Sequence, residues 1–252
     1  MATIDHPDTH YPVRSIPLTR PFIWLRDGWT DMQHHRSASL AYGILVSLLG
    51  ALILAYDRHP FFIAAMTTGF LLMGPILTAG LCELSRCRDE GKIADFQSSL
   101  LPLRRNHSSL LGFAKILSLI AVTWFALSSL VFYGVVGDVA PSLESTTGGD
   151  VVRQLTSTQL TAYVIVGFVL CATVFFLSLV SVPMIVERHV EASTAIRTSL
   201  RVATQDLPAM LVWAALIAGL VAIGVMTGML AMVFIFPLLG HATWRAYKEL
   251  VE

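Results

Sequence analysis

The chain has 252 residues, of which 55 % are hydrophobic and only 13 % are charged, and its mean hydropathy is +0.68. A soluble domain carries about 25 % charged residues, so this composition indicates a membrane protein and excludes a soluble multi-domain enzyme. Seventeen basic residues balance 17 acidic ones, which argues against a general affinity for nucleic acid. The three cysteines form no C-x-x-C pair, so neither a disulfide framework nor a zinc finger is expected.

The N-terminal residues 1–21 are a polar tail punctuated by prolines, without the apolar core of a cleavable signal peptide. A tail of this composition is expected to dock onto something if it is ordered. Apolar residues then recur at steps of three, four and three at Phe22, Leu25, Trp29 and Met32. This spacing predicts a helix lying at the membrane surface, where Trp24 and Trp29 suit the headgroup layer.

Two apolar stretches follow, at 40–56 and 61–82, and each approaches or reaches the length of about 17–25 residues that crosses a bilayer. In the second, Gly74 and Pro75 form a break, because proline lacks a backbone donor and kinks a helix. Gly80 permits close helix approach. The chain leaves this stretch through Glu83 and Arg86 into a charged segment.

The same plan recurs twice. Ile93, Phe96, Leu100 and Leu103 predict a second surface helix, followed by spans at 110–136 and 159–186. Ile196, Leu200 and Ala203 predict a third surface helix. The uncharged stretch 207–240 would be about 51 Å long as one helix, too long for a hydrocarbon core of about 30 Å. Two spans that break near 224–228 are therefore predicted.

We therefore predict an all-α, polytopic membrane protein with six transmembrane helices in three pseudo-repeats, each an amphipathic helix followed by two spans. The expected units are the tail 1–21, repeat 1 at 22–92, repeat 2 at 93–190 and repeat 3 at 191–252. Fourteen of the 17 lysines and arginines lie in the N-terminal segment, the connections 83–108 and 187–206, and the C-terminal end. The positive-inside rule places these segments and both termini in the cytoplasm, with the acidic loop 137–158 outside.

Several of these residues match a known pattern. They are Trp24-Leu25, Gly28-Trp29, Asp31, Ser39-Leu40, Tyr42-Gly43, Gly74-Pro75, Gly80-Leu81, Glu83, Ser85-Arg86 and Glu90-Gly91. On these residues the chain resembles, over nearly its whole length, the bacterial integral-membrane family called domain of unknown function 2189. Cys82 departs from the pattern, which has an aromatic residue there. The resemblance implies a six-span bacterial inner-membrane protein, carries over no catalytic residues, and points to association with respiratory enzymes.

The chemistry open to the chain is limited. No histidine lies in the middle of a predicted span, which excludes a haem-copper catalytic subunit. The cytoplasmic histidines could still converge on a metal, although solvated or interfacial histidines are the simpler interpretation. No span contains Asp or Glu, the residues that mark ion-coupled transport. Asp27 and Asp31, one turn apart, could form a carboxylate pair, but no catalytic motif accompanies them. We expect no catalytic residue, no cofactor and no metal.

These observations favour a non-enzymatic accessory or assembly subunit of a larger bacterial inner-membrane complex. A respiratory complex is one expected host, and membrane lipids and a membrane protein are the expected partners. The alternative is a channel or carrier for a neutral or lipidic solute, which would need a continuous Ser/Thr-lined cavity between the repeats. The candidate interaction and structural residues are Trp24, Trp29, Asp31, Gly74, Pro75, Gly80, Glu83 and Arg86.

Overall fold

The computed structural model describes residues 11–55, 74, 77–136 and 156–251, and within these residues the regular elements are all helices. One further helical segment, at 77–89, lies between α2 and α4 and is called the 77–89 helix. The labelled helices are α1 (Arg20–His34), α2 (Arg36–Ala55), α4 (Phe96–Ser99), α5 (Leu101–Arg105), α6 (His107–Val136), α8 (Ser157–Ser178), α9 (Ser181–Arg188), α10 (Ala192–Gln205), α11 (Leu207–Met226) and α12 (Met232–Leu250).

Four helical stretches of the described residues are long and apolar enough to cross a membrane: Arg36–Ala55, His107–Leu127, Val164–Arg188 and Leu207–Met226. They coincide with four of the six predicted spans. Most of the predicted span 61–82, including Pro75, and nearly all of the predicted loop 137–158 lie outside the described residues. The sixth predicted span corresponds to the first half of α12, whose second half carries Arg245 and Lys248.

The break predicted near 224–228 is confirmed. α11 ends at Met226 and α12 begins at Met232. Between them Gly228 and Met229 take the left-handed backbone conformation, with φ of 61° and 71°. A left-handed pair of residues cannot continue a right-handed helix, so the apolar stretch turns back on itself here.

Pro183 explains the interruption between α8 and α9. A proline in a helix cannot donate to the carbonyl four residues earlier, and its ring clashes with that carbonyl. The residue four positions before Pro183 is Leu179, and the helix is interrupted there, between Ser178 and Ser181.

The three predicted surface helices differ from one another. The first is α1, whose predicted apolar stripe is divided: Met32 is buried and Leu25 packs against the core, whereas Phe22 and Trp29 are exposed. The buried face also carries Trp24, Gly28 and Asp31. The second is two short helices, α4 and α5, which meet at Leu100. The third is the single helix α10.

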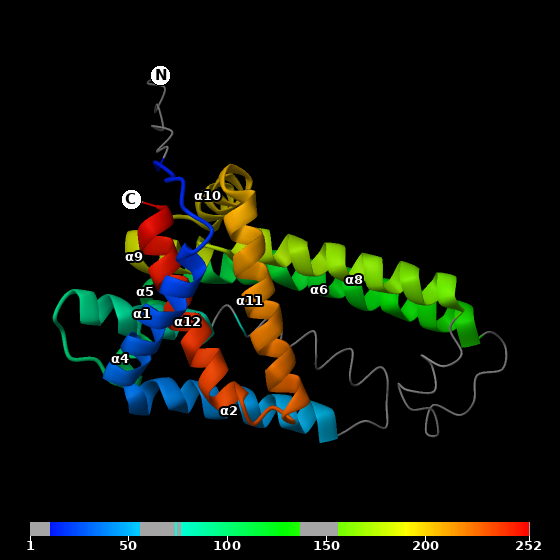
Figure 1. The fold of residues 1–252 in the computed structure, drawn as a ribbon, viewed down its shortest axis with the longest axis horizontal. Helices are drawn as coiled ribbons and strands as arrows, with labels where there is room; N and C mark the ends of the chain where they lie inside the picture. The colour runs from blue at the N-terminus through cyan, green and yellow to red at the C-terminus, as the bar shows by residue number, and fades with distance from the viewer. Residues whose placement is uncertain (1–10, 56–73, 75–76, 137–155, 252) are drawn as a thin grey trace.

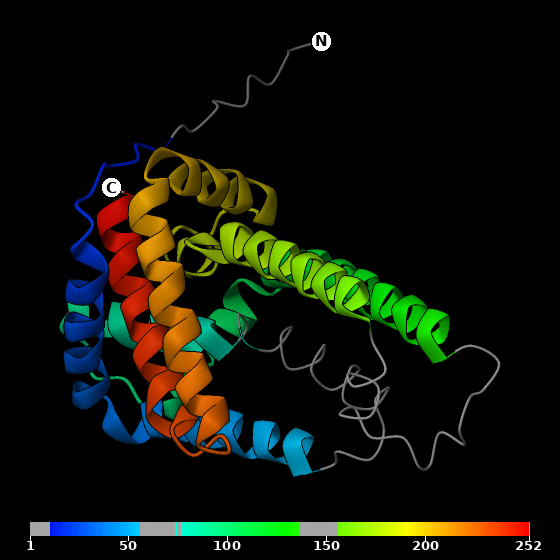
Figure 2. The ribbon, with the colours of Figure 1, turned by 45° about the vertical axis from the view of Figure 1, so that its right-hand side comes forward.

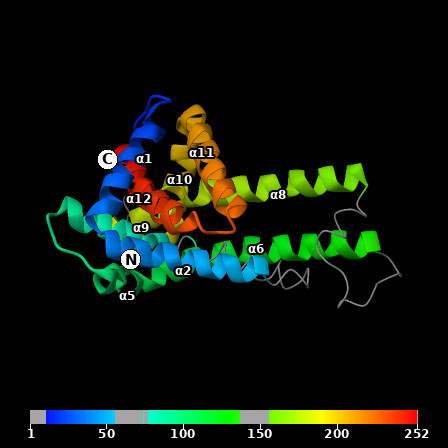
Figure 3. The ribbon, with the colours of Figure 1, turned by 60° about the horizontal axis from the view of Figure 1, so that its bottom comes forward.

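Figure 1 shows α4, α5, α9 and α10 in the half of the molecule that also holds the C-terminus, while α6 and α8 run side by side toward the opposite end. The same paired helices project from the rest of the chain in Figure 2. Figure 3 shows that α2 runs in nearly the same direction as this pair, whereas α11 crosses it. The segments that carry most of the basic residues therefore lie at one side of the molecule.

The main core lies at this side, around the buried aromatic residues Trp24, Phe113, Trp213 and Trp244. Trp24 meets Trp213 edge to face, with ring centroids 5.6 Å apart. The described end of the tail docks on the same region, because Ser15 donates to Asp206 at 2.9 Å and the Arg14 amide donates to the Leu250 carbonyl at 3.3 Å. The tail segment 11–19 is thus bound by the chain itself.

Candidate functional site: a buried polar cluster between the first and last helices

The most prominent polar feature of the described chain is Asp31, whose side chain is fully buried between α1 and α12. Arg245 of α12 donates to it twice, from Nε to Oδ2 and from Nη2 to Oδ1, each at 2.7 Å. Arg88 of the 77–89 helix donates to Oδ1 as well. A buried carboxylate is stable only when it is paired and hydrogen-bonded, and two guanidinium groups meet that requirement here.

His241 forms the centre of the cluster and is completely buried. Its Nε2 lies 2.8 Å from the Ser39 hydroxyl of α2, and its Nδ1 lies 2.7 Å from the Ser85 hydroxyl of the 77–89 helix. Ser85 also donates to Asp31 Oδ2 at 2.8 Å. The four side chains join α2, α12, the 77–89 helix and α1.

The direction of these hydrogen bonds follows from counting protons. Ser85 has one hydroxyl hydrogen, and it goes to the carboxylate of Asp31, which only accepts. Ser85 therefore accepts from Nδ1–H of His241. A neutral imidazole then has an unprotonated Nε2, which accepts from the Ser39 hydroxyl. We call this directed chain, Ser39 to His241 to Ser85 to Asp31, the serine–histidine relay.

The cluster reaches solvent through Arg245 and Asp89. Arg245 Nη1 lies 2.8 Å from Asp89 Oδ1, and Trp244 Nε1 donates to Asp89 Oδ2 at 2.8 Å. A cavity of about 300 Å³ opens over these groups, lined by Asp27, Thr30, Asp31, Arg88, Asp89 and Arg245. The two aspartates of α1 that the sequence places one turn apart therefore border one cavity, but Asp31 is committed to arginines. Asp31 and Asp89 thus serve in ion pairs with Arg88 and Arg245.

Glu83 and Arg86 form a second ion-pair group on the 77–89 helix. Arg86 holds the buried carboxylate of Glu83 with two parallel hydrogen bonds, at 2.8 and 2.6 Å. It also contacts Glu90. The charged residues that follow the second predicted span therefore form a structural ion pair. Arg105 of α5 lies beside this pair, 3.9 Å from Glu83.

The end of α12 carries a third polar group. Tyr247 donates to Glu187 Oε2 at 2.5 Å and accepts from Arg188 Nε at 2.9 Å. Burial, reinforced by the Glu187 carboxylate, raises the pKa of Tyr247 above its ordinary value. Lys248 pairs with Glu187 at 2.9 Å. These contacts fasten α12 to α9.

The remaining candidate residues have structural contacts. Trp24 lies in the core instead of at the headgroup layer, and its Nε1 donates to Glu249 at 2.7 Å. Trp29 is 44 % exposed. A Cβ at Gly80 would lie 2.1 Å from the Tyr42 hydroxyl, so this glycine does permit close helix approach. Gly74 accepts a hydrogen bond from Thr78 at 2.9 Å, and Pro75 lies outside the described residues.

The histidines that the sequence predicts to be cytoplasmic form no metal site in the described chain, where no group of three His, Cys, Asp or Glu side chains has the required arrangement. His189 Nδ1 lies 2.6 Å from Asn106 Oδ1. His35 lies 3.2 Å from the Ala94 carbonyl through Nδ1. Burial, together with the neighbouring His34, lowers the pKa of His35.

Sequence reasoning singled out Asp31 but did not predict that Ser85, Arg88 and Arg245 bind it. It also did not connect the cluster with His241, which contacts Ser85, or with Asp89, which contacts Arg245. One signal was available. His241 and Arg245 are four residues apart, and Ser85 precedes Arg88 by three, spacings that place such side chains on one helical face. Both pairs also follow an apolar stretch. The sequence does not show that the two faces point at Asp31.

The fold and its polar cluster define an integral membrane protein with several apolar helices, held at one side by buried ion pairs. The chain belongs to the family described as predicted integral membrane protein (DUF2189), whose family model matches residues 62–187, half of the chain. The resemblance read from the sequence is thereby confirmed as to family. Ser85 and Arg88 lie within the matched part, whereas Asp31, His241 and Arg245 lie outside it. Searches of curated proteins and of solved structures found no match.

Proposed function

We propose that this protein is a non-catalytic accessory or assembly subunit of a larger bacterial inner-membrane complex, with a respiratory complex as one expected host. The proposal rests on a contrast between the charged and the apolar side chains. The charged side chains around Asp31 are paired within the chain, while the candidate spans leave large apolar side chains exposed. What the molecule offers to other molecules in the membrane is therefore an apolar helix surface.

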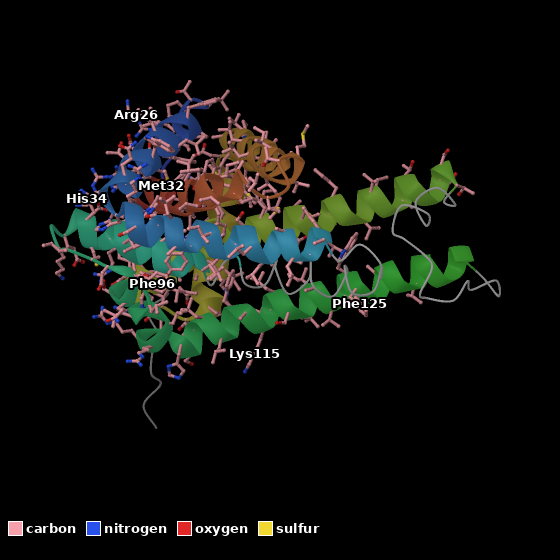
Figure 4. The ribbon with its side chains drawn as sticks, turned by 90° about the horizontal axis from the view of Figure 1, so that it is seen from below. Arg26, Met32, His34, Phe96, Lys115 and Phe125 are labelled. Carbon is pink, nitrogen blue, oxygen red and sulfur yellow. The ribbon has the colours of Figure 1, made fainter. Side chains whose placement is uncertain are left out.

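The pair α6 and α8 offers such a surface among the described helices. The two helices run side by side and project beyond the other elements (Figure 1). Leu119 of α6 is 69 % exposed and Phe168 of α8 is 73 % exposed. Figure 4 shows Lys115 on the outer side of α6, away from the other helices. The apolar faces of α6 and α8 can be covered by lipid, or by a neighbouring helix that adds van der Waals packing.

Six spans with both termini in the cytoplasm agree with this proposal. Fourteen of the 17 basic residues lie in four segments of the sequence. The described parts of these segments lie at the same side of the molecule as the described ends of the chain. The first half of α12 supplies a sixth apolar segment after the turn at Gly228 and Met229. The three pseudo-repeats are part of the proposal, with α1, the α4–α5 segment and α10 preceding α2, α6 and α11.

The described hydroxyl groups of α6 and α8 give little support to the channel or carrier alternative. Thr123 and Thr173 each donate to the carbonyl four residues earlier in their own helix, at 2.8 Å, and both are exposed. Ser178 donates to Val174 in the same way, at 2.5 Å. Hydroxyl groups bonded to their own helix require no polar path.

A cross-linking pull-down tests the proposal. A photo-reactive residue is placed at Phe168 on α8, with Arg26 on α1 as the matched exposed control position, and the tagged protein is isolated at native level in mild detergent. We expect one stoichiometric membrane-protein partner, cross-linked from position 168 and not from position 26. A lone monomer without a partner would contradict the proposal. A clean homo-oligomer would contradict it in favour of the channel or carrier.

A further inference from the structure

A groove lies at the elbow where α1 passes into α2, beside the start of α12. Its volume is about 140 Å³, and its lining residues are Trp29, Met32, Gln33, Arg36, Leu40 and Phe234. Figure 4 marks this elbow by Met32. The groove is separate from the polar cluster, with which it shares no lining residue. Its occupant must therefore be argued from its own residues.

Arg36 is the single charged residue among these six. Within the described part of the chain its guanidinium has no hydrogen bond and no ion pair, in contrast to Arg88 and Arg245, which hold Asp31. Arg36 is also the first residue of a candidate membrane span. An arginine at the end of a span lies at the level of the lipid headgroups, and guanidinium is well suited to phosphate.

The other lining residues supply an apolar wall. Trp29 is 44 % exposed and Phe234 is 49 % exposed. From Arg36 the α2 surface continues at steps of four through Leu40, Ile44 and Leu48, and residues four apart are neighbours on a helix surface. Ile44 and Leu48 are exposed. This row leads from the guanidinium along the apolar span.

α2 and α12 close the floor of the groove. A Cβ at Gly43 would lie 1.9 Å from the Val233 carbonyl oxygen, so the two backbones are in contact directly below Leu40 and beside Phe234. A ligand therefore cannot pass between the helices. It must lie along their outer surface, where hydrocarbon is the surrounding solvent.

We propose that this groove binds one anionic glycerophospholipid, with its phosphate on the Arg36 guanidinium and an acyl chain along Leu40, Ile44 and Leu48. The cavity has the volume of about five water molecules, which suits a phosphate and the adjoining glycerol but not a whole lipid. The acyl chain lies outside it, against Phe234 and the α2 surface. The absence of an acidic residue among the six lining residues favours a headgroup with net negative charge.

Native mass spectrometry of the purified full-length protein in mild detergent tests the proposal. Phosphatidylglycerol is titrated against the wild type, against Arg36→Gln and against the control Arg26→Gln, which removes an exposed arginine of α1 that pairs with Asp27. We expect one retained phosphatidylglycerol, bound about tenfold more weakly by Arg36→Gln and unchanged by Arg26→Gln. Phe234→Ala is expected to weaken binding several-fold through loss of the apolar wall. It also tests the site if Arg36→Gln fails to fold.

Two further ligands separate the sources of the phosphate. Phosphatidylcholine, whose choline cancels the headgroup charge, is expected to bind several-fold more weakly than phosphatidylglycerol. Soluble glycerol 3-phosphate is expected not to compete at equal concentration. Equal binding by Arg36→Gln and the wild type, equal losses in Arg36→Gln and Arg26→Gln, or full competition by glycerol 3-phosphate would each overturn the proposal. Unchanged phosphatidylglycerol binding by a folded Phe234→Ala variant would refute the proposed contact between the acyl chain and Phe234.

Discussion

Gly43 of α2 and the carbonyl of Val233 of α12 are in direct backbone contact, since a Cβ at Gly43 would lie 1.9 Å from that oxygen. Pro237 follows Val233 by four residues within α12. Proline has no amide hydrogen, so the Val233 carbonyl lacks its usual helical donor. The glycine thus lets α2 lie close over a carbonyl that the proline has left without its helical hydrogen bond.

Replacing Gly43 with alanine is expected to destabilise the protein by about 1–3 kcal/mol, the usual cost of forcing an extra methyl group into a packed interface. The obstacle is backbone, which cannot rotate away as a side chain can. Thermal unfolding in detergent, followed by circular dichroism, measures the effect. Gly219→Ala in α11 is the control, because no atom lies within 4 Å of its added Cβ. It should be neutral or slightly stabilising. Equal midpoints for the two variants would refute the contact.

Asp31→Asn is expected to lower the free energy of unfolding by about 3 kcal/mol. Removal of one partner from a buried ion pair costs about 3–5 kcal/mol, and the low end applies because Arg88 and Arg245 are partly exposed. Asp27→Asn is the matched control, since Asp27 lies one turn away and pairs with the exposed Arg26. Denaturant unfolding of the detergent-solubilised variants compares them. The cluster would have no structural role if the two variants were equally stable.

Ser85→Ala is expected to destabilise the protein more than Ser39→Ala. Ser85 accepts from His241 and donates to the Asp31 carboxylate, whereas the hydrogen bond of Ser39 in the relay is its single bond to His241 Nε2. Each buried group left without its partner costs about 1–3 kcal/mol. Unfolding midpoints of the two variants and of Ser193→Ala, an exposed serine of α10, provide the comparison. The reverse order would contradict the direction assigned to the relay.

His35 makes stability depend on pH. Burial lowers its pKa in the folded state, so the unfolded state binds more protons below the ordinary histidine pKa of about 6.5. The contribution of His35 is therefore complete above about pH 6.5 and is lost as the pH falls through the folded-state pKa, with a slope of at most about 1.4 kcal/mol per pH unit.

Unfolding midpoints between pH 7.5 and 5.0 measure this contribution. The wild type is expected to lose more stability on acidification than His35→Gln does. His34→Gln is the control at the neighbouring exposed position, and it should largely retain the acid sensitivity of the wild type. An identical pH dependence in the wild type and His35→Gln would show that His35 does not titrate in this range.

Apolar runs and helix breakers were readable from the sequence because both are local properties. Long apolar stretches predicted α2, α6, α8 and α11, which match the candidate spans. The length of the stretch 207–240, compared with the thickness of a bilayer, predicted the turn that Gly228 and Met229 form. The one-dimensional pattern carried this information because helix length and backbone conformation depend on neighbouring residues.

The faces of the surface helices were not readable in the same way. In α1 the predicted apolar stripe does not lie on one buried face, because Phe22 and Trp29 are exposed while Met32 is buried. The buried side also carries Trp24 and Asp31. In a membrane protein the outer surface can be as apolar as the core. Apolar periodicity therefore does not say which face packs inward.

By itself, the sequence determined that this is an integral membrane protein, and it determined four candidate spans, the break near 224–228 and the family. Only the tertiary structure decided that Asp31 meets Arg245, 214 residues later in the chain, or that His241 lies between Ser39 and Ser85. The physical reason is that a buried charge or imidazole is stable only where groups from several helices satisfy it together. Which groups these are depends on how the helices pack, and no local pattern encodes that.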